Sequence, residues 1–126
     1  MRLHHVQVVV PAGRTQEVVG FYELLGLTRV AKPTQGVAQT GAWFDFPGRT
    51  STGGTQQLHV SEKDGSPHPE QHFAVSIEDL DALVERLTAA GHPFRAGPVV
   101  LGARRGMTAD PVGNPVELVE AVGPFA

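Results

Sequence analysis

The chain has 126 residues, of which 40% are hydrophobic, and it carries a formal net charge of −3 and no cysteine. This length supports one domain with a substantial core but not two independent domains. The sequence has no basic run that would neutralise phosphates, which argues against nucleic-acid or anionic-membrane binding and favours a small-molecule partner. The lack of cysteine excludes thiolate metal sites, disulfides and cysteine nucleophiles, so any metal ion must be held by His, Asp or Glu.

The N-terminal sequence predicts a protein without a targeting segment. Arg2 is followed at once by alternating strand residues, which leaves no room for a signal peptide, and no apolar stretch approaches the length of a membrane span. We therefore expect a cytoplasmic protein with no membrane association.

The first half of the chain predicts a strand, a helix and three further strands. The strand over residues 5–10 alternates, and the helix over residues 16–25 has one apolar face formed by Val18, Phe21, Tyr22 and Leu25. Gly26 is placed to adopt the left-handed conformation that ends a helix. Short apolar segments bounded by turn residues predict the remaining strands, at 27–31, 41–46 and 56–60.

The second half repeats this order. A strand over residues 72–77 precedes a helix whose apolar face comprises Leu80, Leu83, Val84 and Leu87, and Gly91 ends that helix. Ser76 and Asp79 have the spacing of a capping box at its start. Further strands are predicted at 93–96, 104–110 and 115–120.

The two halves therefore look like one unit written twice. His5 and His72 open equivalent strands 67 positions apart, and Gly26 and Gly91 follow equivalent helices 65 positions apart. A long period that occurs only twice indicates a duplicated supersecondary unit. We predict an α+β fold in which residues 1–126 form a single domain, with one βαβββ module over about 1–62, a linker over about 63–70 and a second module over about 71–126.

Strand alternation predicts a polar surface that faces away from the helices. In each strand the apolar set should face the helix, which leaves the other set on the opposite surface. Four potential metal ligands belong to that opposite set: His5, His59, His72 and Glu117. Equivalent histidines in equivalent strands would meet near a pseudo-twofold axis, which is a natural place for one metal ion.

Histidine and carboxylate ligands from separate strands can hold a divalent ion while leaving positions open for water and substrate. His5, His72 and Glu117 are the predicted metal ligands, and zinc, manganese, nickel, cobalt and ferrous iron all suit such a set. A histidine near a strand start is, taken alone, more often a surface or hydrogen-bonded residue. His4 has the parity of Val6, so we expect it to point away from His5 toward the helix side.

We predict a substrate pocket on the same surface, formed by Gln7, Trp43, Gln57, Arg105 and Met107. Trp43, with neighbouring phenylalanines, could form an aromatic wall for a ligand or simply belong to the core. Arg104 and Arg105 could reach an anionic substrate or form a solvated pair on an edge strand.

Four segments together resemble the vicinal oxygen chelate superfamily, which includes glyoxalase I, fosfomycin and bleomycin resistance proteins and extradiol dioxygenases. These segments are His5-Val6-x-Val8-x-Val10, Phe21-Tyr22-x-x-Leu25-Gly26-Leu27, His72-Phe73-Ala74-Val75 and Asp110-Pro111-x-Gly113-Asn114-x-Val116-Glu117-Leu118. The resemblance covers nearly the whole chain. It implies paired βαβββ modules forming a cup-shaped mixed sheet with the helices outside, and a divalent metal ion bound by His5, His72 and Glu117. His59 stands where glyoxalase I has a glutamate.

The resemblance implies a glyoxalase-like, metal-dependent lyase, isomerase or transferase that chelates adjacent oxygens of a small substrate. Glu117 would then be both ligand and catalytic residue, and His59 would be a fourth ligand or general base. The alternative is a non-catalytic protein that binds a small molecule or antibiotic, as bleomycin resistance proteins do, and an inactive accessory domain is a third possibility. Many superfamily members are dimers, so we expect a homodimer.

Overall fold

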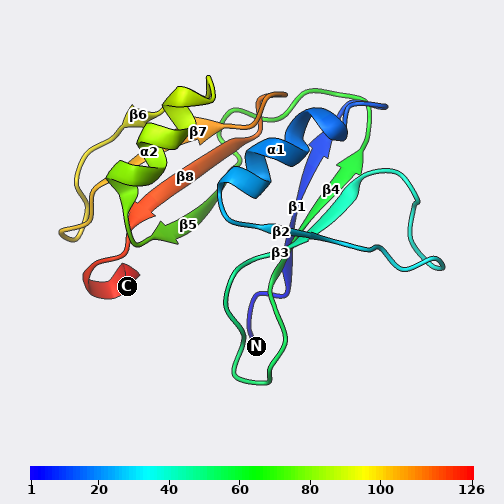
Figure 1. The fold of residues 1–126 in the computed structure, drawn as a ribbon, viewed down its shortest axis with the longest axis horizontal. Helices are drawn as coiled ribbons and strands as arrows, with labels where there is room; N and C mark the ends of the chain where they lie inside the picture. The colour runs from blue at the N-terminus through cyan, green and yellow to red at the C-terminus, as the bar shows by residue number, and fades with distance from the viewer. The chain divides into compact units, whose positions relative to one another are not determined.

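The computed structural model describes residues 1–126, which divide into two compact units, Met1–Pro67 and His68–Ala126. Each unit contains one helix and one four-stranded sheet (Figure 1). We call them module 1 and module 2.

Module 1 has the strand order β1-β4-β3-β2. Its elements are β1 (His5–Val10), α1 (Gln16–Leu24), β2 (Thr28–Val30), β3 (Ala42–Asp45) and β4 (Gln57–Glu62). β1 pairs in parallel with β4, and the other pairings are antiparallel. The parallel pair needs a long crossover, and α1 lies in that crossover.

Module 2 repeats this topology with the strand order β5-β8-β7-β6. Its elements are β5 (Phe73–Ile77), α2 (Leu80–Ala89), β6 (Arg95–Ala96), β7 (Arg105–Ala109) and β8 (Pro115–Glu120), followed by a single 3₁₀ turn, η1 (Gly123–Phe125). β5 is parallel to β8, as β1 is to β4. The structure thus confirms the α+β class and the two βαβββ modules predicted from the repeat.

The apolar faces of the helices and sheets form the core of each module. In module 1, Val18, Phe21 and Tyr22 of α1 are buried, and the Tyr22 and Phe44 rings lie 5.8 Å apart between α1 and β3. In module 2 the buried set is Leu80, Leu83, Leu87, Val116 and Leu118. The helices have 9 and 10 residues, and neither is long and apolar enough to cross a membrane.

The cap predicted for the second helix was partly wrong. The N-cap of α2 is Asp79, whose Oδ1 accepts a hydrogen bond from Ala82 N at 3.0 Å. Ser76 lies inside β5, on the face away from the apolar set, and its hydroxyl donates to the carbonyl of Phe125. A serine that is still in a strand cannot reach the first turn of the following helix, so the capping box does not form.

Candidate functional site

Three aromatic rings form a row across the sheet of module 1. His59 lies on β4, between β1 and β3, and pairs with Gln7 on one side and Trp43 on the other. Its ring is stacked on Trp43 at 4.0 Å and on His5 at 4.2 Å, with interplanar angles of 1° and 17°. The predicted site residues of this module therefore share one face of one sheet: His5, Gln7, Trp43, Gln57 and His59.

A hydrogen-bonded chain fixes the tautomer of His59. Gln57 Nε2 donates to Asp45 Oδ1 at 2.9 Å, which leaves Gln57 Oε1 to accept from His59 Nε2 at 2.9 Å. The neutral His59 ring thus carries its proton on Nε2 and its lone pair on Nδ1. Because both ends of the Gln57 amide are used, this side chain orients His59.

The His59 imidazole is neutral at ordinary pH. It is only 8% exposed, and burial lowers its pKa to about 4, with smaller contributions from the positive charges that His5, His4 and Lys32 carry when protonated. Neutral imidazole is the form that binds metal ions.

His4 is not on the helix side, as its parity had suggested. It precedes β1, and its Nδ1 lies 2.9 Å from His5 Nδ1, with the two rings edge to face. Strand alternation does not apply to a residue outside the strand, so His4 is free to turn toward His5. One of the two Nδ1 atoms must carry the proton of this hydrogen bond.

Module 2 brings its predicted site residues together around Glu117. The Glu117 carboxylate has a close neighbour at each oxygen: Oε2 lies 3.1 Å from His72 Nε2, and Oε1 accepts from Arg105 Nη1 at 2.7 Å. Met107 pairs directly with Glu117 across β7 and β8. The Glu117 side chain is 14% exposed, whereas that of His72 is 37% exposed, so the pair remains accessible from the His72 side.

The hydrogen bonds of His72 bring two acceptor atoms, His72 Nε2 and Glu117 Oε2, into contact. His72 Nδ1 lies 3.1 Å from the carbonyl oxygen of Glu70, which only accepts, so Nδ1 carries the proton. The neutral ring then directs the Nε2 lone pair at a carboxylate oxygen, and two acceptors at 3.1 Å need a positive charge to hold them together. Either a second proton on the ring or a bound cation supplies it.

The geometry of this pair fits a divalent metal ion. Two ligands bound to one ion at about 2.1 Å, as zinc binds nitrogen and oxygen, lie roughly 3.0 to 3.4 Å apart. The Nε2–Oε2 separation of 3.1 Å falls in this range. A histidine that binds metal through one nitrogen also usually donates its other N–H to a carbonyl or carboxylate, as His72 does to Glu70. Neither module by itself gathers three or more His, Asp or Glu side chains that could hold an ion.

The two neighbouring arginines separate onto opposite faces of the sheet. Arg104 pairs with Asp81 and Glu120 at 3.0 Å each, and hydrogen bonds to these carboxylates raise its pKa. Arg105 faces Glu117. Only Arg105 therefore belongs to the candidate site.

Sequence reasoning did not assign a supporting role to five residues that support these clusters: His4, Asp45, Glu70, Ser76 and Phe125. Asp45 is two positions from Trp43 on the same strand, so alternation could have placed it on this face. Phe125 lies beyond the last strand, where periodicity gives no signal.

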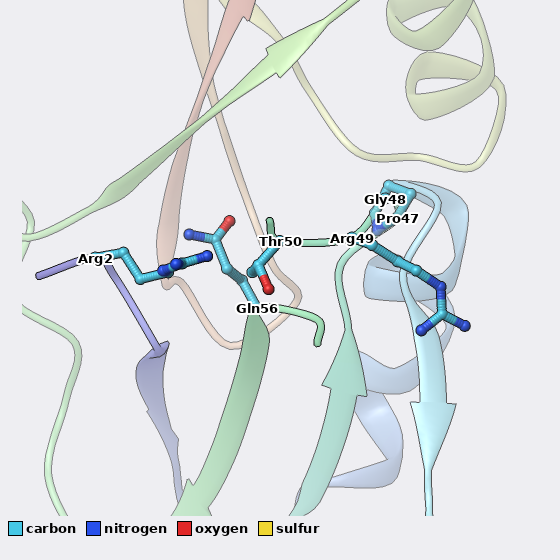
Figure 2. Close-up of a pocket in the computed structure, with 6 residues that line it drawn as sticks. All are labelled: Arg2, Pro47, Gly48, Arg49, Thr50 and Gln56. Atoms are coloured by element: carbon cyan, nitrogen blue, oxygen red, sulfur yellow. The ribbon is translucent and has the colours of Figure 1, made fainter. Parts of the chain in front are cut away.

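A pocket of about 290 Å³ lies near the N-terminus and the β3–β4 connection. It is lined by Arg2, Pro47, Gly48, Arg49, Thr50 and Gln56 (Figure 2). Arg2 points toward Gln56, while the Arg49 side chain turns away and donates to the carbonyl of Gly53 at 2.8 Å. This pocket contains none of the predicted substrate-pocket residues.

Comparison with known proteins agrees with this architecture. A structure described as a glyoxalase family protein from Bacillus anthracis superposes with a TM-score of 0.82 at 26% identity, covering 95% of this chain and 94% of that one. The fosfomycin resistance protein FosX from Listeria monocytogenes gives 0.72 at 19% identity, covering 93% and 88%. Lactoylglutathione lyase from Agrobacterium tumefaciens gives 0.67 at 19%, covering 94% and 92%. The last two similarities concern the fold alone.

No match to the chain was found among curated proteins. Residues 2–118, which are most of the sequence, match the family model described as Glyoxalase/Bleomycin resistance protein/Dioxygenase superfamily. The chain belongs to this superfamily.

Proposed function

We propose that the protein is a divalent-metal-dependent enzyme that acts on a small oxygenated molecule, with His72 and Glu117 as metal ligands. The observation that carries this proposal is the contact between His72 Nε2 and Glu117 Oε2, combined with the proton held on Nδ1 by the Glu70 carbonyl. This arrangement presents one nitrogen and one oxygen lone pair to the same point. His5 remains the predicted third ligand.

The bound ion would polarise two adjacent oxygens of the substrate and stabilise negative charge that develops on them. The residues of the chain orient the ligands around it. Glu70 fixes the tautomer of His72, and Arg105 holds Oε1 of Glu117 so that Oε2 is directed at His72. Imidazole and carboxylate ligands suit zinc, manganese, nickel, cobalt or ferrous iron.

We assign His59 to metal or substrate contact in its neutral form. A pKa of about 4 makes it a weak acceptor of protons at pH 7, so the role of ligand or hydrogen-bonding partner fits it better than the role of general base. Glu117 is the proposed catalytic carboxylate. Gln7, Trp43 and Met107 lie beside the candidate ligands in the strand register and are the proposed substrate contacts.

Calorimetric titration of the metal-free protein with Zn²⁺ and Co²⁺ tests the proposal. We expect near-stoichiometric binding to the wild type and a loss of at least 100-fold in affinity for His72→Ala and Glu117→Gln. His92→Ala, which removes a histidine beyond α2, is the control and should bind as the wild type does. Equal affinity in all four proteins would refute the assignment of the ligands.

The competing function is metal-independent binding of a small molecule or antibiotic. It predicts ligand binding that survives both chelation and His72→Ala, whereas the metal-dependent enzyme loses activity in both cases. We also propose a homodimer, which sedimentation analysis of the purified protein would test.

A further inference from the structure

The C-terminal turn η1 contacts the candidate site through two different strands. The Phe125 carbonyl accepts a hydrogen bond from Ser76 Oγ on β5, and the Phe125 ring lies 5.2 Å from the Arg105 guanidinium on β7. Ser76 and Arg105 both pair with Val119 of β8, from opposite sides. Phe125 therefore bridges the two strands that flank β8, across Val119, which is 4% exposed.

The cross-strand pairs that contain Val119 lie next to the pairs that contain Glu117 on the same sheet. By strand alternation, Val119 and Glu117 lie on the same face of β8. The Arg105 side chain extends from its position beside Val119 to bind Glu117 Oε1 at 2.7 Å. Arg105 Nη1 is thus committed to the carboxylate, while Arg105 Nε is buried with no hydrogen-bond partner. A long side chain with so few hydrogen bonds needs other contacts to hold its position, and the Phe125 ring supplies one.

We infer that Phe125 is a positioning residue: it holds Arg105 in the orientation that binds Glu117 Oε1 and leaves Oε2 free to act as a metal ligand. The cation–π contact restricts the guanidinium, and the Ser76 hydrogen bond restricts the backbone that carries the ring. The C-terminal turn thus acts on Glu117 through Arg105. This inference rests on the proposed function, because Glu117 is taken as a metal ligand.

Ser76 and Phe125 act together, because the hydrogen bond from Ser76 fixes the backbone that carries the Phe125 ring. Removing either should release Arg105, so the effects of Ser76→Ala and Phe125→Ala on metal affinity should not add. Arg104→Gln is a matched control, because Arg104 is the adjacent residue on the opposite face and pairs only with Asp81 and Glu120. Phe125→Tyr keeps the ring and should behave as the wild type does.

Two measurements test the inference. The first is the Co²⁺ dissociation constant, which should rise about tenfold in Phe125→Ala, in Ser76→Ala and in the double variant, as is usual when a partner of a metal ligand is lost. The second is the ¹⁵N relaxation of the Arg105 Nε–H group in the metal-free protein, which should show an ordered side chain in the wild type and in Phe125→Tyr, and a mobile one in Phe125→Ala. Thermal melting confirms that each variant is folded.

The two readouts separate failure of this inference from failure of the proposed function. If the wild type binds no metal, the proposed function is wrong, and Arg105 mobility alone decides whether Phe125 holds the guanidinium. If Arg105 stays equally ordered in Phe125→Ala, or if that variant binds Co²⁺ as tightly as Arg104→Gln does, the positioning role is overturned.

Discussion

The indole of Trp43 lies parallel to the imidazole of His59, with ring centroids 4.0 Å apart and an interplanar angle of 1°. Trp43 is the only tryptophan of the chain, so its fluorescence reports on this one histidine. Protonated imidazole in contact with an indole quenches its emission, whereas a neutral ring does so much less. The stacking therefore gives the charge state of His59 a direct optical readout.

We predict that tryptophan emission falls as the pH is lowered, with a midpoint near pH 4, the pKa of His59. The groups around this ring are His5, His4 and Lys32, together with Asp45, which reaches it through Gln57. In His59→Gln the transition should disappear. A midpoint near 6.5 that survives in this variant would show that another histidine quenches Trp43.

The same pKa predicts a pH-dependent stability. The pKa of His59 is lower in the folded state than the ordinary value of 6.5, so the unfolded state binds the proton more readily. The free energy that neutral His59 contributes to folding is fully present above pH 6.5. It decreases as the pH falls from 6.5 toward 4, and below pH 4 it does not change further. One pKa unit corresponds to about 1.4 kcal/mol, so the difference between 6.5 and about 4 corresponds to a loss of roughly 3 kcal/mol.

Urea unfolding of the wild type and His59→Gln between pH 4 and 8 measures this effect. The other five histidines and the carboxylates contribute to both proteins, so the difference between the two curves isolates His59. Parallel curves would contradict the burial of a neutral His59.

Gly106 lies between Arg105 and Met107 on β7, and we predict that Gly106→Ala is strongly destabilising. A Cβ at this position would lie 2.4 Å from the carbonyl oxygen of Arg95 and 2.3 Å from Cζ of Phe94. The backbone contact cannot be relieved by rotating a side chain, so we expect a loss of about 3 kcal/mol or more in the free energy of unfolding.

Gly20→Ala is the matched control for this substitution. Gly20 lies in α1, and a Cβ there would meet nothing within 4 Å. Alanine is favoured over glycine inside a helix by about 1 kcal/mol, so this variant should be slightly more stable than the wild type. Equal unfolding midpoints for the two variants would show that β6 and β7 do not approach as closely as described.

His4 should influence the metal affinity of His5. If His5 binds an ion through Nε2, its Nδ1 carries a proton, and that proton is donated to His4 Nδ1 at 2.9 Å. His4→Ala removes this acceptor, and we expect about tenfold weaker Co²⁺ binding with unchanged stability, because His4 is exposed and precedes β1. If His4→Ala binds Co²⁺ as tightly as His92→Ala does, His4 has no role in metal binding.

The duplicated order of elements could be predicted from sequence because each signal is local. Apolar spacing gave the helices, and Gly26 and Gly91 have positive φ values of +100° and +84°, as expected of residues that end helices. Alternation also predicted that His5 and His59 share one face of their sheet, as their stacked rings do, since the period of a strand does not depend on its neighbours.

The supporting contacts could not be predicted in the same way. The Asp45–Gln57–His59 chain depends on the register of β3 against β4, which pairs Asp45 with Gln57. The bridge made by Phe125 depends on how a segment without periodicity turns back onto the sheet. Register and chain reversal are tertiary properties, so residue types alone do not give them.

The central claim is tested most directly by the metal content of the protein, purified without a histidine tag or chelator, and measured by elemental analysis beside a His5→Ala/Glu117→Ala double variant. We predict about one divalent ion per chain in the wild type and none in the variant. Absence of bound metal in the wild type, even after incubation with zinc, manganese, nickel, cobalt and ferrous ions, would contradict the proposed function and favour metal-independent binding of a small molecule.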